Sequence, residues 1–430
     1  MMARLWLWGY SLLMRALQPL ALRKLRRRAR DEPLYGQHIP ERWGHYAVPP
    51  GHGYVWVHAV SLGETRAAAL LLARVRAQWP GQHLLLTHGT ATGREAGQAL
   101  LQPGDVQVWQ PWDTPEVVRR FLEHFRPRVG LLMETEVWPN CVQACRERGV
   151  PLLLVNARMS EKSARQARRW RGLSQPAYAG LSEAWAQTEG DARRLRELGV
   201  RVTPVLGNLK FDVQLDAHQQ AGGERAREAL SSPVVVLASS REGEEAAFLQ
   251  ALRQHPDACR NVRWAIVPRH PQRFDEVAGL IQAAGGGVLR RSQFETLEQA
   301  SRQWAKQDDH TVLLGDSLGE MASYGGMATV TIMGGSFEPL GGQNLIEPLS
   351  CGSPVVVGPH TFNFAQATQE ALQAGVAVQV PTWSEALTAA LSWTQPGTHD
   401  HEVSRQCREF VQRHAGAVHR SVDRLSTWLG

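Results

Sequence analysis

Short apolar runs alternate with stretches of helical period along most of the 430-residue chain. A strand that is buried on both faces of a sheet is a nearly continuous apolar run, and a following helix returns the chain to begin a parallel neighbour. The runs form two sets: residues 54–60, 83–87, 106–109, 129–133, 151–155, 184–188 and 202–206, then 233–238, 263–267, 288–290, 311–314, 328–333, 354–357 and 376–380. The pattern predicts an α/β fold of parallel βαβ units.

The two sets predict two facing, doubly wound, Rossmann-like domains, because 430 residues exceed what one core usually supports. We expect the first domain over residues 31–212, a polar linker over 213–232 and the second domain over 233–430. The helical stretch 402–428 would close the second domain, and a return to the first domain stays open. Ligands of open α/β sheets bind beyond the carboxyl ends of the strands, so the loops that follow strands should line a cleft.

The N-terminal 30 residues hold eight Lys or Arg and no acid, which leaves 39 basic and 41 acidic residues elsewhere. The nearly neutral remainder argues against a nucleic-acid-binding body. The first 22 residues are mostly apolar, with Trp6, Trp8 and Tyr10 interleaved, but Arg4 and Arg15 interrupt them, and the basic run follows. A cleaved signal peptide has the opposite order. Residues 1–30 therefore predict attachment to an anionic membrane surface, with the body on the cytoplasmic face. Spanning and interfacial attachment both stay open, as does a helix that packs on another protein.

Several familiar sites are missing from the sequence. There is no Asp-x-Asp pair, P-loop, Gly-x-Ser-x-Gly or HExxH, so no metal or cofactor is predicted. The cysteines form no CxxC pair and suit a reducing compartment as buried thiols. They are Cys141, Cys145, Cys259, Cys351 and Cys407.

A glycine-rich loop after residues 328–333 resembles a phosphate cradle. Gly334, Gly335 and Ser336 begin it, and backbone N–H groups beside glycines can approach an anion closely. Asn344 and Glu347 follow where a helix begins, and Glu347 could accept hydroxyls from a ribose. An ordinary tight turn with a capping glutamate is an equally good explanation of this loop alone.

Other loops that follow predicted strands carry side chains suited to anions and sugars. Arg269, next to His270 and held between prolines, can form a fork of hydrogen bonds with a phosphate. In the first domain, a turn with Ser61 and Gly63 precedes a helix. The remaining candidates there are Glu136, Arg158 and Lys210. For these, a capping turn, a helix dipole partner or a solvated side chain is the simpler alternative.

Taken together, the motifs closely resemble those of the 3-deoxy-D-manno-octulosonic acid (Kdo) transferases, over essentially the whole chain. The matching motifs are Glu41-Arg42-Trp43-Gly44, residues 58–64, 133–140, 156–158, 209–212 and 267–271, Gly334-Gly335-Ser336, and residues 342–347 and 358–364. One departure is Gln343, where related enzymes often carry His. The resemblance implies the GT-B fold and inverting transfer of Kdo from CMP-Kdo to a lipid A precursor at the cytoplasmic face of the inner membrane.

The resemblance also implies roles for the candidate residues. It makes Glu41 the general base, although an exposed Glu beside Arg42 is usually a surface ion pair. It places the acceptor or the Kdo carboxylate on Ser61, Gly63, Glu136, Arg158 and Lys210, and CMP on Arg269, His270, Gly334, Gly335, Ser336, Asn344 and Glu347. Another GT-B transferase, a UDP-sugar epimerase and a non-catalytic membrane-attached binding protein remain alternatives.

Overall fold

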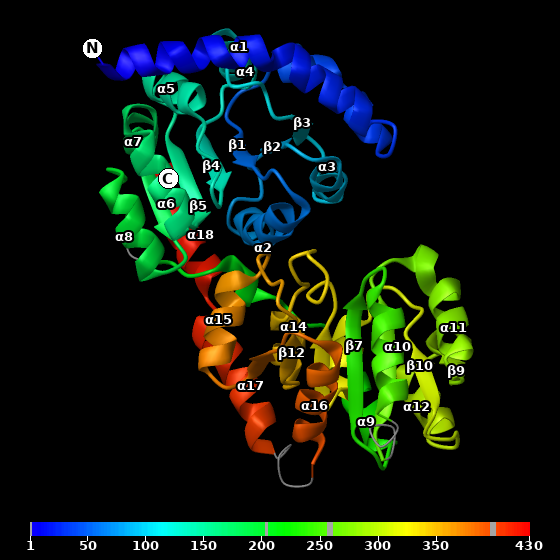
Figure 1. Ribbon diagram of the computed structural model, residues 1–430. Helices are drawn as coiled ribbons and strands as arrows, with labels where there is room; N and C mark the ends of the chain where they lie inside the picture. Colours follow the sequence, from blue (N-terminus) through cyan, green and yellow to red (C-terminus); the bar gives the residue numbers. More distant parts are fainter. Residues whose placement is uncertain (1, 203–204, 256–260, 396–400) are drawn as a thin grey trace. The chain divides into compact units, whose positions relative to one another are not determined.

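The computed structural model describes residues 2–202, 205–255, 261–395 and 401–430. The chain divides into two units, Met1–Asp212 with His414–Gly430, and Val213–Arg413. Each unit contains one parallel sheet with helices packed on its two faces (Figure 1). The alternation of apolar runs and helical stretches therefore predicted the α/β class and the two parallel sheets correctly.

The first unit has a six-stranded sheet in the order β3-β2-β1-β4-β5-β6. Neighbouring side chains of a strand enter opposite cores, since Val55 and Val57 pack on one face of the sheet and Trp56 on the other. The predicted run 202–206 includes two residues outside the described ones, and Val202 forms an isolated bridge with Ala184. The strands are β1 (Val55–His58), β2 (Leu84–His88), β3 (Val106–Trp109), β4 (Val129–Met133), β5 (Leu152–Ala157) and β6 (Glu183–Ala186).

Helices cover both faces of this sheet. One face packs against α2 (Leu62–Gln78) and α18 (Ala417–Leu429), whereas α4 (Pro115–Phe125), α5 (Pro139–Glu147) and α8 (Glu189–Glu197) pack on the other. The remaining helices of the unit are α3 (Ala91–Gln98), α6 (Glu161–Arg169), α7 (Arg171–Ala179) and the short 3-10 turns Pro33–Gly36, Ile39–Trp43 and Leu209–Asp212.

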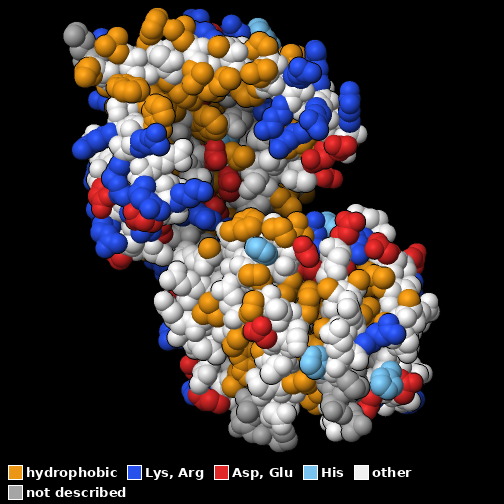
Figure 2. Space-filling model, in the orientation of Figure 1, with side chains coloured by type: hydrophobic (Ala, Val, Ile, Leu, Met, Phe, Trp, Pro, Cys, Tyr) orange, Lys and Arg blue, Asp and Glu red, His pale blue; other side chains and the backbone are white. Residues whose placement is uncertain are grey.

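The N-terminal segment forms one helix, α1 (Met2–Arg28), which packs against α5 and α7 (Figure 1). None of the helices in the described part of the chain has both the length and the apolar character needed to cross a membrane. The outer face of α1 nevertheless exposes large apolar side chains, visible as an orange band in Figure 2. They are Met2, Leu5, Trp8, Leu12, Leu13, Leu17 and Leu20, whereas the partly exposed Trp6 packs edge-on against Trp170.

The second unit has a seven-stranded sheet in the order β13-β12-β11-β7-β8-β10-β9. Its strands are β7 (Val234–Ser240), β8 (Arg263–Pro268), β9 (Gly287–Arg290), β10 (Thr311–Leu314), β11 (Val330–Met333), β12 (Val355–Val357) and β13 (Ala377–Gln379). Helices α10 (Glu244–Gln254), α11 (Phe274–Ala283) and α16 (Trp383–Thr394) share one core with the sheet. The other helices are α9 (Ala217–Glu228), α12 (Leu297–Trp304), α13 (Met321–Met327), α14 (Ile346–Cys351), α15 (Ala365–Gln373) and α17 (His401–His414).

The expected linker 213–232 is instead largely helical. Helix α9 spans Ala217–Glu228 and packs against α13. Gly223 and Gly326 permit this packing, because a Cβ on Gly223 would lie 2.1 Å from the Ser323 carbonyl oxygen and one on Gly326 would lie 2.6 Å from that of Gln220. Gly223, which lies in the expected linker, and Gly326 therefore form a contact surface between two helices.

The C-terminal stretch also differs from the expectation that it closes the second domain. It breaks at Gly416, which has φ +91°, and α18 belongs to the first unit. The buried carboxylate of Glu183 in β6 accepts a 2.9 Å hydrogen bond from Arg424 of α18, and the carboxylate of Asp212 accepts from the backbone N–H of Gly416. These polar contacts join the end of the chain to the first sheet.

The expected buried thiols can be compared for four of the five cysteines. Cys141, Cys145, Cys351 and Cys407 are buried and free. Cys259 lies outside the described residues.

Candidate functional site

Two residues with left-handed backbone conformation mark the carboxyl edge of the first sheet. Glu134 follows β4 with φ 56°, and Asn156 near the end of β5 has φ 52°. Non-glycine residues rarely adopt this conformation, and in native proteins it concentrates at functional sites. Both side chains are buried. The strand ends where the sequence placed its candidates are therefore also where the backbone is strained.

An ion-pair cluster surrounds Glu134. Lys210 Nζ lies 3.0 Å from Glu134 Oε1, and Arg158 Nη1 lies 3.6 Å from Oε2. The Arg158 backbone N–H also donates to the Glu134 carbonyl oxygen at 3.2 Å. Glu134 thus brings together two of the predicted site residues, Arg158 and Lys210. Glu134 itself was included only within the motif 133–140. The Arg158 side chain is 35% exposed and can reach a ligand.

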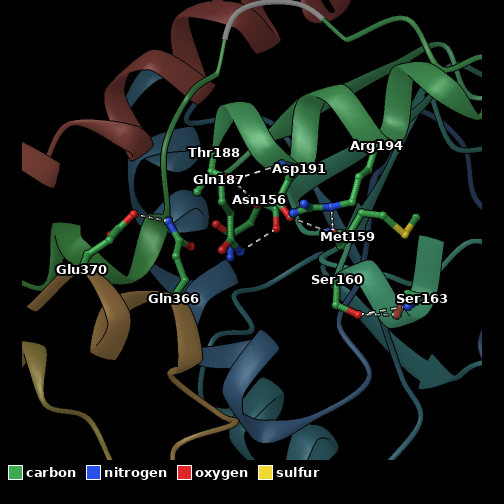
Figure 3. A network of polar contacts seen from close by, with 10 residues as sticks. All are labelled: Asn156, Met159, Ser160, Ser163, Gln187, Thr188, Asp191, Arg194, Gln366 and Glu370. Atoms are coloured by element: carbon green, nitrogen blue, oxygen red, sulfur yellow. Dashed lines mark hydrogen bonds and ion pairs between the residues drawn. The ribbon is translucent and has the colours of Figure 1, made fainter. Parts of the chain in front are cut away.

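A polar network fixes the loop that carries Arg158 (Figure 3). Asp191 accepts from the Met159 backbone N–H at 2.8 Å, and Arg194 donates to the Met159 carbonyl oxygen. Gln187 donates to the Asn156 carbonyl oxygen at 2.9 Å. These contacts hold residues 156–159 from the side of α8, so Arg158 is presented by a rigid loop.

Glu64 occupies the first turn of α2 in a capping box. The Ser61 hydroxyl accepts from the Glu64 backbone N–H at 3.4 Å, and the Glu64 carboxylate accepts from the Val60 backbone N–H at 2.7 Å and from the Ser61 hydroxyl at 3.1 Å. Burial, with a smaller contribution from the nearby carboxylates of Glu134 and Glu136, raises the pKa of Glu64 to about 7, although the hydrogen bonds from Val60 and Ser61 act to lower it. A carboxyl group with this pKa can accept a proton near neutral pH.

The surface beside Glu64 is open at Gly63. A Cβ at Gly63 would meet only the Ser61 hydroxyl, at 3.9 Å. Glu136 is close enough for its charge to act on Glu64. Burial raises the pKa of Glu136, and the charge of Glu134 also raises it, whereas the 3.0 Å hydrogen bond from Trp138 Nε1 lowers it. Figure 2 shows a hollow lined by acidic side chains beneath the apolar band of α1. Three carboxylates and two cations thus meet at one edge of the sheet.

Helix α1 is tied to the loop that carries Glu136. The buried Asp113 carboxylate accepts from the backbone N–H groups of Asn140 at 3.0 Å and Cys141 at 2.8 Å, which caps α5. Burial raises the pKa of Asp113 to about 6. On α1, the buried Ser11 hydroxyl donates to Asn140 Oδ1 at 2.9 Å. The N-terminal helix is therefore anchored one residue after the Trp138-Pro139 turn.

Glu41, the base that the resemblance implies, lies in a different setting. Its side chain is buried. The Oε2 atom accepts one hydrogen bond from Arg94 Nη1 at 2.6 Å and another from the Trp109 backbone N–H at 2.7 Å. Arg42 stacks on the Trp109 ring with its guanidinium carbon 4.3 Å from the ring centre. Glu41 is thus a buried ion-pair partner rather than an exposed loop residue, and its Oε2 is already engaged by two donors.

In the second unit, a carboxylate of the chain itself occupies the glycine-rich loop. The fully buried Glu244 accepts from the backbone N–H groups of Gly335 at 2.7 Å and Phe337 at 3.1 Å. The Ser336 hydroxyl donates to the Met333 carbonyl oxygen and accepts from the Gly358 N–H at 2.8 Å. These amides and this hydroxyl hold neighbouring loops together, so the expected phosphate cradle is not formed by the N–H groups of Gly335 and Phe337.

Basic side chains gather next to this loop, after β7 and β8. The pKa of His270 is lowered by burial and then by the charges of Arg241, Arg269 and Arg273. Arg273 is paired with Glu245 at 2.7 Å and with Glu276 at 3.0 Å. The predicted Arg269 and His270 therefore belong to a group of positive charges at the carboxyl edge of the second sheet.

The start of α14 carries the other two candidates. Asn344 Oδ1 accepts from the Ile346 backbone N–H at 3.1 Å, which forms a turn before the helix. Glu347 is half-buried in the first turn, and its charge helps to raise the pKa of Cys351 to about 12 after burial. Gly334 allows the loop to approach β7 closely, since a Cβ there would lie 2.5 Å from the Ser239 carbonyl oxygen.

Sequence reasoning missed four residues that the structure brings into these sites. Glu64 carried a usable signal, because Ser61-x-x-Glu64 after an apolar run is a capping box at a strand end. Glu134 was named only within its motif. Glu244 and Arg241 gave no signal, since their contacts with the loop join segments about ninety residues apart.

The family model of 3-deoxy-D-manno-octulosonic-acid transferase (kdotransferase) matches residues 37–213. The chain is 45% identical to the 3-deoxy-D-manno-octulosonic acid transferase of Bordetella pertussis over 434 residues, which cover 98% of this chain and 99% of that protein. It is 28% identical to the enzyme of the same description from Haemophilus influenzae, over 99% of each chain.

Solved structures support the fold. A glycosyltransferase from Rickettsia africae is 11% identical with a TM-score of 0.55, covering 88% of this chain and 99% of that one. A putative UDP-N-acetylglucosamine 2-epimerase from Listeria monocytogenes is 15% identical with a TM-score of 0.54, covering 86% and 95%. Since transferases and epimerases share this fold, the fold alone does not choose between them. The sequence relationship does, and the chain belongs to the 3-deoxy-D-manno-octulosonic acid transferase family.

Proposed function

We propose that this protein transfers Kdo from CMP-Kdo to a lipid A precursor, with inversion at the anomeric carbon. The observation that carries the proposal is the half-buried Glu64, whose pKa is about 7, next to the Glu134–Lys210 ion pair. Inverting transfer needs a base for the attacking hydroxyl and a stabilised leaving group on the opposite side of the anomeric carbon. The first unit offers the base, with Lys210 and Arg158 at the same sheet edge for anionic groups of the substrates.

In the proposed step, a hydroxyl oxygen of the acceptor attacks the anomeric carbon of Kdo while the bond from that carbon to the CMP phosphate oxygen breaks. The hydroxyl proton passes to the carboxylate of Glu64, and CMP leaves with the bonding electron pair. Lys210 and Arg158 bind anionic groups of the substrates, and Glu134 holds both cations in place. Ser61, Gly63 and Glu136 border the acceptor hydroxyl.

Glu64 is better suited than Glu41 to act as the base. Glu41 Oε2 already accepts two short hydrogen bonds, one of them from Arg94 at 2.6 Å. Glu64 also accepts two hydrogen bonds, from the Val60 N–H and the Ser61 hydroxyl, but burial raises its pKa to about 7, which suits proton acceptance near neutral pH. We assign Glu41 the role of fixing the 39–43 turn onto β3, which makes it a positioning residue.

We assign CMP to the second unit. Arg269 and His270 lie in its basic group, Asn344 and Glu347 begin α14, and Glu347 accepts the ribose hydroxyls. Gly334, Gly335 and Ser336 shape the loop, and we assign the contact with the nucleotide to the outer surface of this loop. This differs from a cradle of N–H groups, because those of Gly335 and Phe337 are engaged by Glu244.

We further propose that α1 lies in the interface of the bacterial inner membrane, on its cytoplasmic face. Seven exposed apolar side chains form its outer face, from Met2 to Leu20, and its last turn contains Arg26, Arg27 and Arg28. Apolar burial together with attraction to anionic lipids holds such helices at a membrane surface. The lipid acceptor is presented at the same surface.

The test combines donor and acceptor choice. Purified protein is incubated with CMP-Kdo and a tetraacylated lipid A precursor, and the lipid product is identified by mass spectrometry while free CMP is measured. The expected result is a mass gain of one or more Kdo residues with equal release of CMP. Turnover of UDP-sugars without Kdo transfer would reject the proposal, as would binding of CMP-Kdo without CMP release in the presence of the acceptor.

A further inference from the structure

The basic group of the second unit contains one arginine, Arg241, whose guanidinium has a buried N–H group without a hydrogen-bond acceptor among the described residues. Arg241 follows β7 and is half-buried, and its buried Nε–H donates to no acceptor among the described residues. The backbone N–H of Arg241, in contrast, donates to Glu244 at 2.9 Å. The backbone of Arg241 is therefore fixed while its guanidinium has hydrogen-bonding capacity left.

Neighbouring arginines of the same unit have acidic partners. Arg273 pairs with Glu245 at 2.7 Å, Arg290 with Asp316 at 3.3 Å and Arg291 with Glu320 at 2.7 Å. Within the described ranges, Arg241 forms no ion pair of this kind. A half-buried guanidinium without a counter-charge is costly unless a ligand supplies one.

Arg241 also lies against the glycine-rich loop. A Cβ on Gly335 would be 3.6 Å from Arg241 Cγ and 3.0 Å from the amide nitrogen of Gln343. Gly335 has φ 67°, so the loop turns here without a side chain, and Arg241 and Gln343 both lie beside the position that a side chain would fill. Because Gln343 is neutral, Arg241 is the positive charge at this point of the loop.

The inner side of the same loop is occupied by a carboxylate. Glu244 takes the N–H groups of Gly335 and Phe337, so a bound phosphate must obtain its counter-charge elsewhere. The field around Arg241 is positive, since its charge is among the causes that lower the pKa of His270. An oxyanion placed beside Gly335 would therefore meet a guanidinium fork and a neutral amide.

We propose that Arg241 is a donor-binding residue whose guanidinium binds an oxyanion of CMP-Kdo, either its phosphate or the Kdo carboxylate. The inference rests on the proposed function, because it takes CMP-Kdo as the ligand of this unit. It adds a residue that the motifs of the family did not indicate, and it replaces the loop amides as the main source of positive charge.

The test is calorimetric binding of cytidine, CMP and CMP-Kdo to the full-length wild-type protein and to Arg241→Gln, Arg241→Lys and Arg253→Ala. Arg253 is the matched control, because it is exposed in the last turn of α10, on the element that follows Arg241. We expect Arg241→Gln to weaken the binding of an anionic ligand by about 10- to 100-fold, as for loss of a charge-assisted hydrogen bond. Cytidine affinity should stay unchanged, Arg241→Lys should recover part of the loss, and Arg253→Ala should match the wild type.

The ligands separate the possible outcomes. A loss already seen with CMP assigns Arg241 to the phosphate, and a loss seen only with CMP-Kdo assigns it to the carboxylate. Equal affinities of wild type and Arg241→Gln for both ligands, or a parallel loss for cytidine, would overturn the inference. If the wild type bound neither CMP nor CMP-Kdo, the proposed function itself would fail, and this result is distinct from the others.

Discussion

The ammonium of Lys210 lies 3.0 Å from Oε1 of Glu134, and this ion pair joins the turn at the end of the first unit's N-terminal segment to the strained residue after β4. Both side chains are at most 17% exposed. Removing one partner would leave the other as a buried, uncompensated charge, which usually costs more than the pair contributes.

We predict that Lys210→Met and Glu134→Gln each lower kcat by about 100-fold or more, because both residues set the charge around the reacting groups. The double variant should lose little more than the worse single variant, since residues that act as a unit are not additive. Single-turnover kinetics with saturating CMP-Kdo measure this effect. Independent, multiplicative losses would show that the two residues do not act together.

The pH profile of the reaction should reflect Glu64. Burial raises its pKa from 4.5 to about 7, so the carboxylate form needed for proton acceptance is populated as the pH rises through about 7. We predict that kcat rises with a midpoint near pH 7, and that Glu64→Gln lowers kcat by about 100- to 10,000-fold and abolishes this limb of the profile. A profile that keeps its midpoint in Glu64→Gln would assign the titration to another group.

The same pKa has a consequence for stability. A carboxyl whose pKa is raised in the folded chain binds its proton more tightly there than in the unfolded chain. Its contribution to the free energy of unfolding is present below the ordinary value of 4.5 and is lost as the pH rises from 4.5 to about 7. Urea titrations of wild type and Glu64→Gln at pH 5 and pH 8 should therefore differ most at pH 8, where the variant is relatively more stable. A variant that gains no stability relative to the wild type between these two pH values would contradict the raised pKa.

The fold was predictable because the signal lies in local sequence. Buried parallel strands such as Leu84–His88 are continuous apolar runs, and each is followed by a helical stretch. Helix α9 was missed because its polar residues and Gly222-Gly223 resemble a linker, whereas packing on α13 decides its structure. Tertiary contact outweighed local propensity there.

The sites were predictable only in part. Loops after strands were found because the position of a loop follows from the strands that flank it, and Arg158 and Lys210 meet as a result. The ion pair between Glu41 and Arg94, and the hydrogen bond from the Gly335 N–H to Glu244, each join residues that are far apart in the sequence. No spacing in the sequence reports such long-range pairs, so the surroundings of Glu41 and the carboxylate in the glycine-rich loop became visible only in the structure.

The Glu41–Arg94 pair should act on stability more than on chemistry. The two side chains are 12% and 9% exposed, and Oε2 of Glu41 also holds the backbone of Trp109. We predict that Glu41→Gln lowers the free energy of unfolding by about 3–5 kcal/mol, with a smaller effect on kcat than Glu64→Gln where the variant is folded. Urea unfolding together with kinetics at 15 °C separates the two effects. A folded, fully stable Glu41→Gln that lacks turnover would restore Glu41 as the base.

The outer face of α1 should bind membranes without being needed for the fold. The inner face holds the helix to the first unit, through Ser11 and Asn140 at 2.9 Å, Arg15 and Glu116 at 2.8 Å, and Gln18 and Trp43 at 3.2 Å. Leu12, Leu13 and Leu20 are exposed on the other side, so replacing them should leave these contacts intact.

We predict that wild type sediments with phosphatidylglycerol vesicles and much less with phosphatidylcholine vesicles. Each of Leu13→Asp and Leu20→Asp should weaken this binding by about tenfold, since the apolar transfer energy of one leucine is lost and an anion is added. High salt should weaken binding to the anionic vesicles, because the basic end of α1 contributes through screened charges. Thermal unfolding should stay within a few degrees of wild type. Unchanged vesicle binding in the Leu13→Asp, Leu20→Asp double variant would exclude this face of α1 as the attachment surface, whereas loss of folding in that variant would show that these leucines pack against protein and not lipid.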